Sequence, residues 1–332
     1  MGTSIVWNGA QGIERTSREA PPPGPGEVRM AIEACGLCGT DLHIASGEYP
    51  LARPRVVLGH EFCGTVAQVG EDVENVSTGD RVVVDPNIPC RSCPHCQGGR
   101  PHLCEHPQAI GVTRDGGLSE AVTVPASQLY RVPEGLPPEA AALTEPLACV
   151  LHAVDLSGVL PGERALVLGA GPIGVLAAAL LVAAGSSGVL VSEPDPARRE
   201  RVREFGATPI SPEELDGQGD FGVVLECVGR PETMRQAVES ARAGGTIVWV
   251  GVAPPQAEVS IRPYDIFRRE LTIRGTYTNP FTMERSLALL ASGRIDWRKV
   301  ITHRLPLDRF DEAWEAHRAG DGLKVCVTPG TA

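Results

Sequence analysis

The chain has 332 residues, of which 42% are hydrophobic and 21% charged, and this length is enough for two domains with cores of their own. Its net charge of −11 argues against a nucleic-acid partner bound by general electrostatic attraction. The N-terminus shows no export signal, and the longest apolar run, Val175 to Ala184, is too short to cross a bilayer. We therefore expect a cytoplasmic protein with reduced thiols and no membrane partner.

The first part of the chain, up to about residue 147, has short strand-forming runs separated by Gly and Pro. Examples are Val56 to Leu58, Gly64 to Val69 and Arg81 to Asp85. This pattern predicts an irregular, mostly β domain.

A cysteine cluster interrupts this domain with the spacing C-x2-C-x2-C-x7-C. Four thiolates can close a tetrahedral shell around Zn²⁺, and a closed shell is typical of structural sites. The alternatives are a pair of disulfides, which ten Cys residues without an export signal argue against, and buried apolar cysteines. The spacing predicts a structural zinc in a lobe of about residues 88 to 106, held by Cys90, Cys93, Cys96 and Cys104.

A change of pattern near residue 148 marks a second domain, in which strands and helices alternate. Such alternation predicts an α/β domain with a parallel sheet covered by helices. The predicted strands are Ala165–Leu168, Val189–Ser192, Val223–Cys227 and Thr246–Val250, and the predicted helices are Ile173–Ala184, Ala197–Phe205 and Glu232–Ala243. After about residue 278 we expect one helix, Met283–Ala291, and a β-rich tail that ends with Leu323–Thr328.

A glycine-rich turn follows the first of these strands and opens a helix, as in dinucleotide-binding folds. Gly169 permits the tight turn, Gly171 lets the backbone approach a pyrophosphate, and Gly174 lets helix and strand pack closely. Glu193, after the next strand, would accept hydrogen bonds from the adenosine ribose and favour NAD over NADP. Asp195 is an alternative for this role, and Arg198 or Arg199 would partly offset repulsion of a 2′-phosphate. The predicted cofactor-binding residues are Gly169, Gly171, Pro172, Ile173, Gly174, Glu193 and Arg198.

Candidate ligands for a second metal ion are spread over the first domain. Cys38 opens the segment Cys-Gly-Thr-Asp-Leu-His43, His60-Glu61 follows, and Glu145 lies near the domain boundary. Cys, His and Glu are suitable ligands of a catalytic zinc, because three protein ligands leave one position open.

The order GxCGTDxH, GHE, CxxCxxCx7C, EP and GAGPIG resembles the zinc-containing medium-chain alcohol and polyol dehydrogenases over essentially the whole chain. Glu145 resembles the sorbitol, butanediol and threonine dehydrogenase branch. The resemblance implies a GroES-like domain of residues 1–147 and 279–332, interrupted by a Rossmann domain of residues 148–278. It also implies two zinc ions: a catalytic one on Cys38, His60 and Glu61, with Glu145 as fourth or alternating ligand, and a structural one on the four cysteines.

The segment between Pro209 and Phe221 is shorter than in relatives, which puts one covering helix in doubt. Cys149 is interpreted as a small buried residue rather than a metal ligand, and Cys35 and Cys63 as packing residues. The remaining histidines, including His317, are given no role. Gly251 and the segment 275–277 are candidate nicotinamide contacts, and the late strands are a candidate edge for a homodimer or homotetramer.

The expected function is oxidation of a secondary alcohol, polyol or sugar-like, with NAD as the hydride acceptor. Thr40 would accept the hydroxyl proton and His43 would release it to solvent. Since the charges of Cys38 and Glu61 cancel that of Zn²⁺, Glu145 would make the site negative, so we expect it to exchange. Alternatives are an L-threonine 3-dehydrogenase, a 2,3-butanediol dehydrogenase, or a dehydrogenase of an aminocyclitol-like biosynthetic alcohol. Other classes are a zinc-free enone or quinone reductase and a non-catalytic zinc module.

Overall fold

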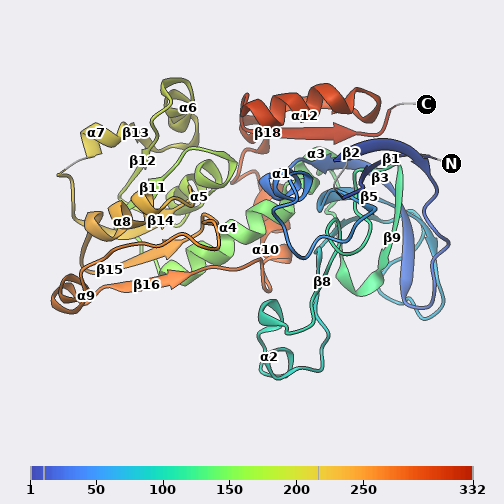
Figure 1. The fold of residues 1–332 in the computed structure, drawn as a ribbon, viewed down its shortest axis with the longest axis horizontal. Coiled ribbons are helices and arrows are strands. Elements are labelled where there is room, and N and C mark those ends of the chain that lie inside the picture. The colour runs from blue at the N-terminus through green and yellow to red at the C-terminus, as the bar shows by residue number, and fades with distance from the viewer. Residues whose placement is uncertain (1, 10–11, 216, 331–332) are drawn as a thin grey trace. The chain divides into compact units, whose positions relative to one another are not determined.

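The computed structural model describes residues 2–9, 12–215 and 217–330, which form two compact units (Figure 1). Unit 1 contains the chain up to Pro146 and from Met283 onward, and unit 2 is the continuous segment Leu147–Thr282. The chain therefore leaves unit 1, builds unit 2, and returns. The sequence predicts these divisions after residues 147 and 278.

Unit 1 is mostly β. Its strands are β1 Gly2–Trp7, β2 Ile13–Arg18, β3 Glu27–Gly36, β4 Val56–Val57, β5 Glu61–Val69, β6 Arg81–Val84, β7 Asn87–Ile88, β8 Gln108–Ala109, β9 Ala121–Pro125, β10 Leu129–Arg131, β17 Ile301–Pro306 and β18 Lys324–Thr328. Its helices are α1 Gly39–Ala45, α2 Pro94–Gln97, α3 Pro138–Ala142, α10 Met283–Ala291, α11 Trp297–Val300 and α12 Phe310–Ala319, with short 3₁₀ turns at η1 Pro101–Leu103, η2 Ala126–Gln128 and η4 Leu307–Arg309.

Strand β3 lies at the centre of the main sheet, whose order is β10-β6-β5-β3-β18-β17, with β9 also paired to β3. Val28, Met30 and Ile32 alternate along β3 and are buried in the core, as the period of a strand requires. The C-terminal strand β18 pairs antiparallel with the end of β3, where Val327 faces Cys35. The last residues of the chain thus complete a sheet that begins near the first ones.

The C-terminal segment is less β-rich than the sequence predicts, because α12 forms where no helix was expected. Phe310 and Ala313 are buried on one side of α12, and Trp314 packs on Phe310 with ring centroids 5.7 Å apart. These contacts at spacings of three and four residues are the helical signal. Figure 1 shows α12 running along β18.

Unit 2 is an α/β domain. Its strands are β11 Arg164–Leu168, β12 Gly188–Ser192, β13 Thr208–Ile210, β14 Phe221–Glu226, β15 Ala241–Trp249 and β16 Thr272–Gly275, and its helices are α5 Pro172–Ala183, α6 Pro196–Arg201, α7 Pro212–Leu215, α8 Pro231–Ser240 and α9 Pro263–Arg269, with η3 Val202–Phe205. Helix α4, Thr144–Ser157, carries the chain into this unit. The described strands are all parallel, in the order β13-β12-β11-β14-β15-β16. This is the strand order of a Rossmann fold, so the predicted fold class is confirmed.

Several helix boundaries differ from the predicted ones. Helix α8 ends at Ser240 rather than Ala243, because the Arg269 guanidinium donates hydrogen bonds to the carbonyls of Val238 and Ala241 and ends the helix there. The helix expected from Ala197 to Phe205 divides into α6 and the 3₁₀ turn η3. The covering helix in doubt is present as the short α7, which buries Leu215.

The apolar run Val175 to Ala184 forms most of α5, which packs on β11 and β12. Within the described residues, none of the helices combines the length and the apolar character that a bilayer crossing needs.

Candidate functional site

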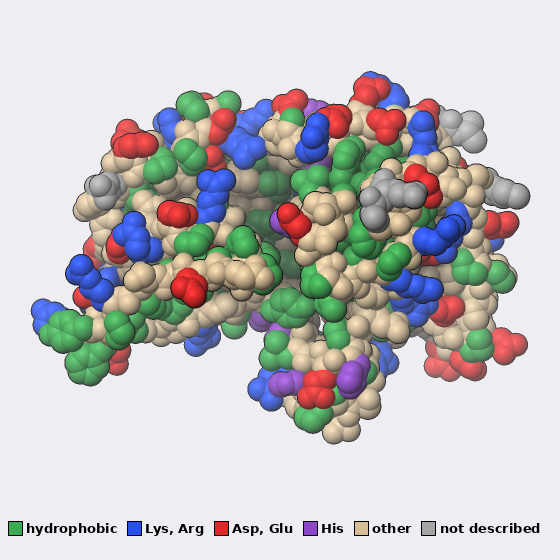
Figure 2. Space-filling model, in the orientation of Figure 1, with side chains coloured by type: hydrophobic (Ala, Val, Ile, Leu, Met, Phe, Trp, Pro, Cys, Tyr) green, Lys and Arg blue, Asp and Glu red, His purple; other side chains and the backbone are tan. Residues whose placement is uncertain are grey.

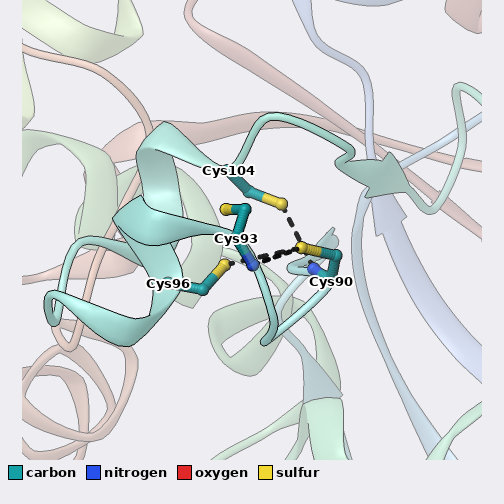
Figure 3. Close-up of side chains that lie close together, drawn as sticks. All are labelled: Cys90, Cys93, Cys96 and Cys104. Atoms are coloured by element: carbon teal, nitrogen blue, oxygen red, sulfur yellow. Dashed lines mark hydrogen bonds between the residues drawn. The ribbon is translucent and has the colours of Figure 1, made fainter.

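The cysteine lobe brings its four sulfur atoms together, within 4.8 Å of one another (Figure 3). Cys93 caps α2, and its backbone N–H donates to Cys90 Sγ at 3.3 Å, while the Cys90 N–H donates to Cys104 Sγ at 3.2 Å. Hydrogen bonds from Ser92 lower the pKa of Cys90 to about 5. Amide donors to sulfur stabilise thiolates, so this donor set fits a tetrahedral zinc.

Histidine side chains are also visible on the lobe in Figure 2, where the sequence has His95, His102 and His106. None of them belongs to the four-sulfur cluster found among the described residues. A closed four-sulfur shell needs no further ligand, so the zinc predicted here would be structural.

We expect Cys93→Ser to lower the zinc content by one ion per chain and the Tm by roughly 5 to 10 °C, since about 2 to 3 kcal/mol of metal-linked stability would be lost. Metal analysis and calorimetry of the purified protein check this. Unchanged zinc content in Cys93→Ser would contradict the four-thiolate site.

A second cluster lies at the junction of β3, α1 and β5. Cys38 caps the N-terminus of α1, while His60 and Glu61 stand at the start of β5. One ligand atom from each lies within 4.8 Å of the others. Burial lowers the pKa of His60, but the negative charges of Cys38 and Asp41 outweigh it and raise this pKa well above its usual value. Such an excess of negative charge suits a cation.

Asp41 lies against two members of this cluster and has no role in the sequence-based prediction. Its carboxylate is fully buried and accepts a hydrogen bond from the Cys38 N–H at 2.9 Å. Its other oxygen lies 3.8 Å from His60 Nδ1. Carboxylates behind a metal-binding histidine fix the ring and its tautomer. With Nδ1 turned to Asp41, the second ring nitrogen of His60, Nε2, is the one left for a metal.

Glu145 lies in the first turn of α4 and is buried, with 8% of its surface exposed. It is not a member of the three-residue cluster, but its charge raises the pKa of His60. The structure therefore assembles Cys38, His60 and Glu61 as predicted neighbours and places Glu145 close to them.

Lys324 is a second residue that the sequence-based prediction lacks. Its ammonium donates hydrogen bonds to both carboxylate oxygens of Glu61, each at 2.8 Å, and to the Leu37 carbonyl at 3.1 Å. Burial lowers the pKa of Lys324, but the negative charges of Glu61, Cys38 and Glu145 together outweigh this and raise it, so the group is charged. The sequence signal that could have revealed this role is the presence of a charged residue inside the otherwise apolar strand Leu323–Thr328.

His317 also reaches this region, although the sequence gives it no partner. It lies on α12, where burial lowers the pKa of its ring and the nearby Cys38 backbone partly offsets this effect. The segment from α12 to β18 thus supports the cluster from two positions.

Thr40 and His43, the predicted relay residues, are both on α1. Thr40 Oγ1 lies 3.7 Å from Cys38 Sγ and is half-buried, whereas His43 is exposed and its Nδ1 lies 3.0 Å from Glu48 Oε2. One hydroxyl therefore stands beside the metal-binding cluster and one imidazole stands at the surface.

The glycine-rich turn of unit 2 links β11 to α5. Gly169 has a φ of +95°, which favours glycine, and a Cβ on Gly174 would lie 1.9 Å from the Gly169 carbonyl oxygen. A Cβ on Gly171 would meet nothing within 4 Å, so this position borders open space at the start of α5. Pro172 and Ile173 form the first helical turn, where free N–H groups favour phosphate.

Glu193 ties this turn to the end of β12. Its carboxylate accepts hydrogen bonds from the N–H groups of Ala170, at 2.8 Å, and Asp195, at 3.0 Å. Asp195 is instead engaged as the cap of α6, where it accepts from the Arg198 N–H at 2.8 Å. Arg199 donates to the Glu193 carbonyl at 2.7 Å. Glu193 is therefore better placed than Asp195 to accept a hydrogen bond from a ribose.

Gly251 allows close packing of the backbone, since a Cβ there would lie 2.1 Å from the Gly229 nitrogen.

Two family descriptions match the chain: "Alcohol dehydrogenase GroES-like domain" over residues 24–134 and "Zinc-binding dehydrogenase" over residues 172–292. L-galactonate-5-dehydrogenase of Escherichia coli K12 is 37% identical over 94% of this chain and 91% of its own length. The chain belongs to the zinc-containing medium-chain alcohol dehydrogenases. The predicted family and enzyme class are thereby confirmed: the chain is an NAD(P)-dependent oxidoreductase that acts on CH–OH groups.

Further relatives of this dehydrogenase agree over nearly its full length. L-threonine 3-dehydrogenase of Pyrococcus abyssi is 36% identical and covers 95% of both chains. A crystal structure of a zinc-binding dehydrogenase from Sinorhizobium meliloti, bound to NADP, is 39% identical, has a TM-score of 0.95 and covers 99% of both chains.

Proposed function

We propose that this dehydrogenase oxidises a secondary alcohol of a polyol or sugar-like compound to the ketone, with NAD as the hydride acceptor. The observation that carries this proposal is the buried cluster of Cys38, His60 and Glu61, whose three ligand types fit a zinc with an open position. Zinc at that site supplies Lewis acidity, which makes a substrate hydroxyl easier to deprotonate. A second, structural zinc would be held by the cysteine lobe.

The substrate class is supported by the names of the relatives. L-galactonate and L-threonine both carry a secondary hydroxyl beside other polar groups. A threonine- or 2,3-butanediol-type substrate and an aminocyclitol-like alcohol remain the alternatives within the same chemistry.

NAD is proposed over NADP because the buried Glu193 carboxylate lies at the turn where the adenosine ribose binds in this fold. A 2′-phosphate would have to approach this negative charge. Because the related Sinorhizobium meliloti enzyme was crystallised with NADP, activity has to be measured with NAD and NADP in parallel.

The proton of the substrate hydroxyl is proposed to leave through Thr40 and then His43. The half-buried hydroxyl of Thr40 can accept a proton and pass one on, and the exposed imidazole of His43 can exchange protons with water.

Thr40→Ala is expected to lower kcat by roughly 100-fold or more, because a positioned proton acceptor is lost, with zinc content unchanged. Thr40→Ser keeps the hydroxyl and should retain most of the activity. Steady-state kinetics together with metal analysis check both. Full activity in Thr40→Ala would contradict the relay.

Self-association, as a homodimer or homotetramer, is proposed for unit 2. Strand β16 lies at the sheet edge, and the nearby helix α9 exposes Tyr264 and Phe267, with 66% and 81% of their surfaces accessible. Figure 2 shows hydrophobic side chains gathered at the end of unit 2 where Figure 1 places α9. Exposed aromatic side chains beside an unpaired edge favour an interface. A cytoplasmic location is proposed from the reduced cysteines that zinc binding requires.

The function is tested by following NADH and NADPH formation with the zinc-loaded protein. Polyols, aminocyclitols, sugars and sugar acids, 2,3-butanediol, L-threonine and simple alcohols form the panel. Turnover of a polyol-like compound, faster with NAD than with NADP, is expected. A protein that contains no zinc, or binds neither cofactor, would contradict the proposal.

A further inference from the structure

The buried ammonium of Lys324 has every one of its protons engaged. An ammonium has three donors, and the three acceptors within reach are Glu61 Oε1, Glu61 Oε2 and the Leu37 carbonyl. Lys324 has 5% of its surface exposed and Glu61 has 1%, so water takes no large part in this contact. The arrangement is saturated, and the charge is held in one place.

Lysine is unusual in this chain, which has Lys299 and Lys324 as its two lysines among 30 basic residues. Lys299 is exposed, whereas Lys324 lies at the metal-binding cluster. A compact ammonium with three separate donors fits the two carboxylate oxygens and the carbonyl, while the planar guanidinium of arginine presents its donors in a rigid fork. The site therefore matches lysine specifically.

From this contact we infer that Lys324 is a positioning residue of the proposed catalytic zinc centre: it fixes the Glu61 carboxylate and supplies the positive charge that lets Glu61 and Glu145 serve the same ion. The inference rests on the proposed function, because it concerns a zinc ion at Cys38, His60 and Glu61.

The charge balance at the site is the first argument. Zn²⁺ is neutralised by the Cys38 thiolate and one carboxylate, with His60 neutral, so a second carboxylate would leave the centre negative. Among the described residues, Lys324 forms the ion pair with Glu61 and adds one positive charge beside the cluster. The centre with both Glu61 and Glu145 then becomes neutral overall. This changes the sequence-based expectation that Glu145 has to exchange.

The geometry of the carboxylate is the second argument. Each oxygen of an ionised carboxylate has two lone-pair directions, so an oxygen that accepts from Lys324 keeps another for a metal. Lys324 also begins β18, next to Val325, whose carbonyl accepts from the Leu37 N–H at 2.9 Å. Lys324 thus holds Glu61 in a fixed position relative to the chain that leads to Cys38. Residues that hydrogen-bond to a metal ligand from behind set the orientation and basicity of that ligand.

The test compares Lys324→Met and Lys324→Gln with the matched control Lys299→Met, which removes the exposed lysine. Each protein is loaded with zinc, and the release of both ions to a chelator is followed with time. The cysteine lobe serves as the internal reference. Because Glu61 loses the group that holds its carboxylate, and Glu145 loses the charge that lets it share the ion, we expect release from the second site to speed up at least about tenfold in Lys324→Met. Release from the lobe should not change.

Turnover should fall by about 10- to 100-fold in the same variants, as for other partners behind metal ligands, with KM changed less than kcat. Lys324→Gln keeps hydrogen-bond donors without the charge, so it carries the test if Lys324→Met does not fold. Lys299→Met should match the unmodified protein in both measurements.

Faster zinc release from the cysteine lobe as well, together with a lowered Tm in both Lys324 variants, would overturn the inference, since it would mean that Lys324 only supports the fold. Unchanged release and turnover would overturn it as well. Failure of the proposed function is seen separately, because the unmodified protein would then show no second zinc before any variant is made.

Discussion

Replacing Cys38 with alanine is expected to reduce alcohol oxidation by at least about 10³-fold and to remove one of two zinc ions per chain. A Lewis acid is worth several kcal/mol at the transition state, and each 1.4 kcal/mol corresponds to about tenfold in rate. Cys38 is the only thiol in the cluster with His60 and Glu61 among the described residues. Its loss leaves one histidine and carboxylates, a weaker donor set for zinc.

Metal analysis and initial rates check this result, and Cys149→Ser is the matched control. Cys149 lies close in sequence to Glu145, and the clusters of metal-binding groups found in the described chain do not include it. We expect Cys149→Ser to keep both zinc ions. Loss of a zinc ion from Cys149→Ser, with both ions retained in Cys38→Ala, would show that Cys149 and not Cys38 binds the metal.

The second large effect is expected at the glycine-rich turn, where Gly174→Ala should destabilise unit 2 by about 3 kcal/mol and abolish cofactor binding. The new Cβ would lie 1.9 Å from the Gly169 carbonyl oxygen, which is backbone and cannot turn aside. The turn would have to open, and Glu193 would lose its contact with the Ala170 N–H.

Gly171→Ala separates stability from binding. At Gly171 a Cβ meets nothing within 4 Å, so we expect stability to change by less than about 0.5 kcal/mol. The methyl group would nevertheless stand where a pyrophosphate approaches the backbone, and NADH affinity should fall roughly 100-fold. Denaturant unfolding and NADH fluorescence titration measure the two effects. Equal behaviour of the two alanine variants would contradict the separate roles given to these glycines.

The features predicted from the sequence are those carried by local pattern. The strand Ala165–Leu168 and the turn after it are read from a few consecutive residues, and the cysteine lobe from fixed spacing. Helix α12 was missed because its buried face is narrow, with Phe310 and Ala313 as its buried residues. The end of α8 was misplaced because the side chain that ends it, Arg269, comes from another helix.

Contacts between distant segments explain the rest. Lys324 and Glu61 are 263 positions apart, and only the pairing of β18 with β3 brings them together. Asp41 lies inside a predicted motif, but its role depends on burial and on His60, a residue of another element. Pairing between strands so far apart cannot be read from spacing within either one.

The return of the chain to unit 1 also fixes the order in which a newly made molecule can be completed. While a ribosome is still adding residues beyond 300, unit 2 has its full sequence, and so does the cysteine lobe. The sheet around β3 still lacks β17 and β18, and Glu61 has no cationic partner. The centre proposed for the chemistry is therefore assembled after unit 2, and a chain cut before Lys324 would carry the cofactor turn without a finished metal site.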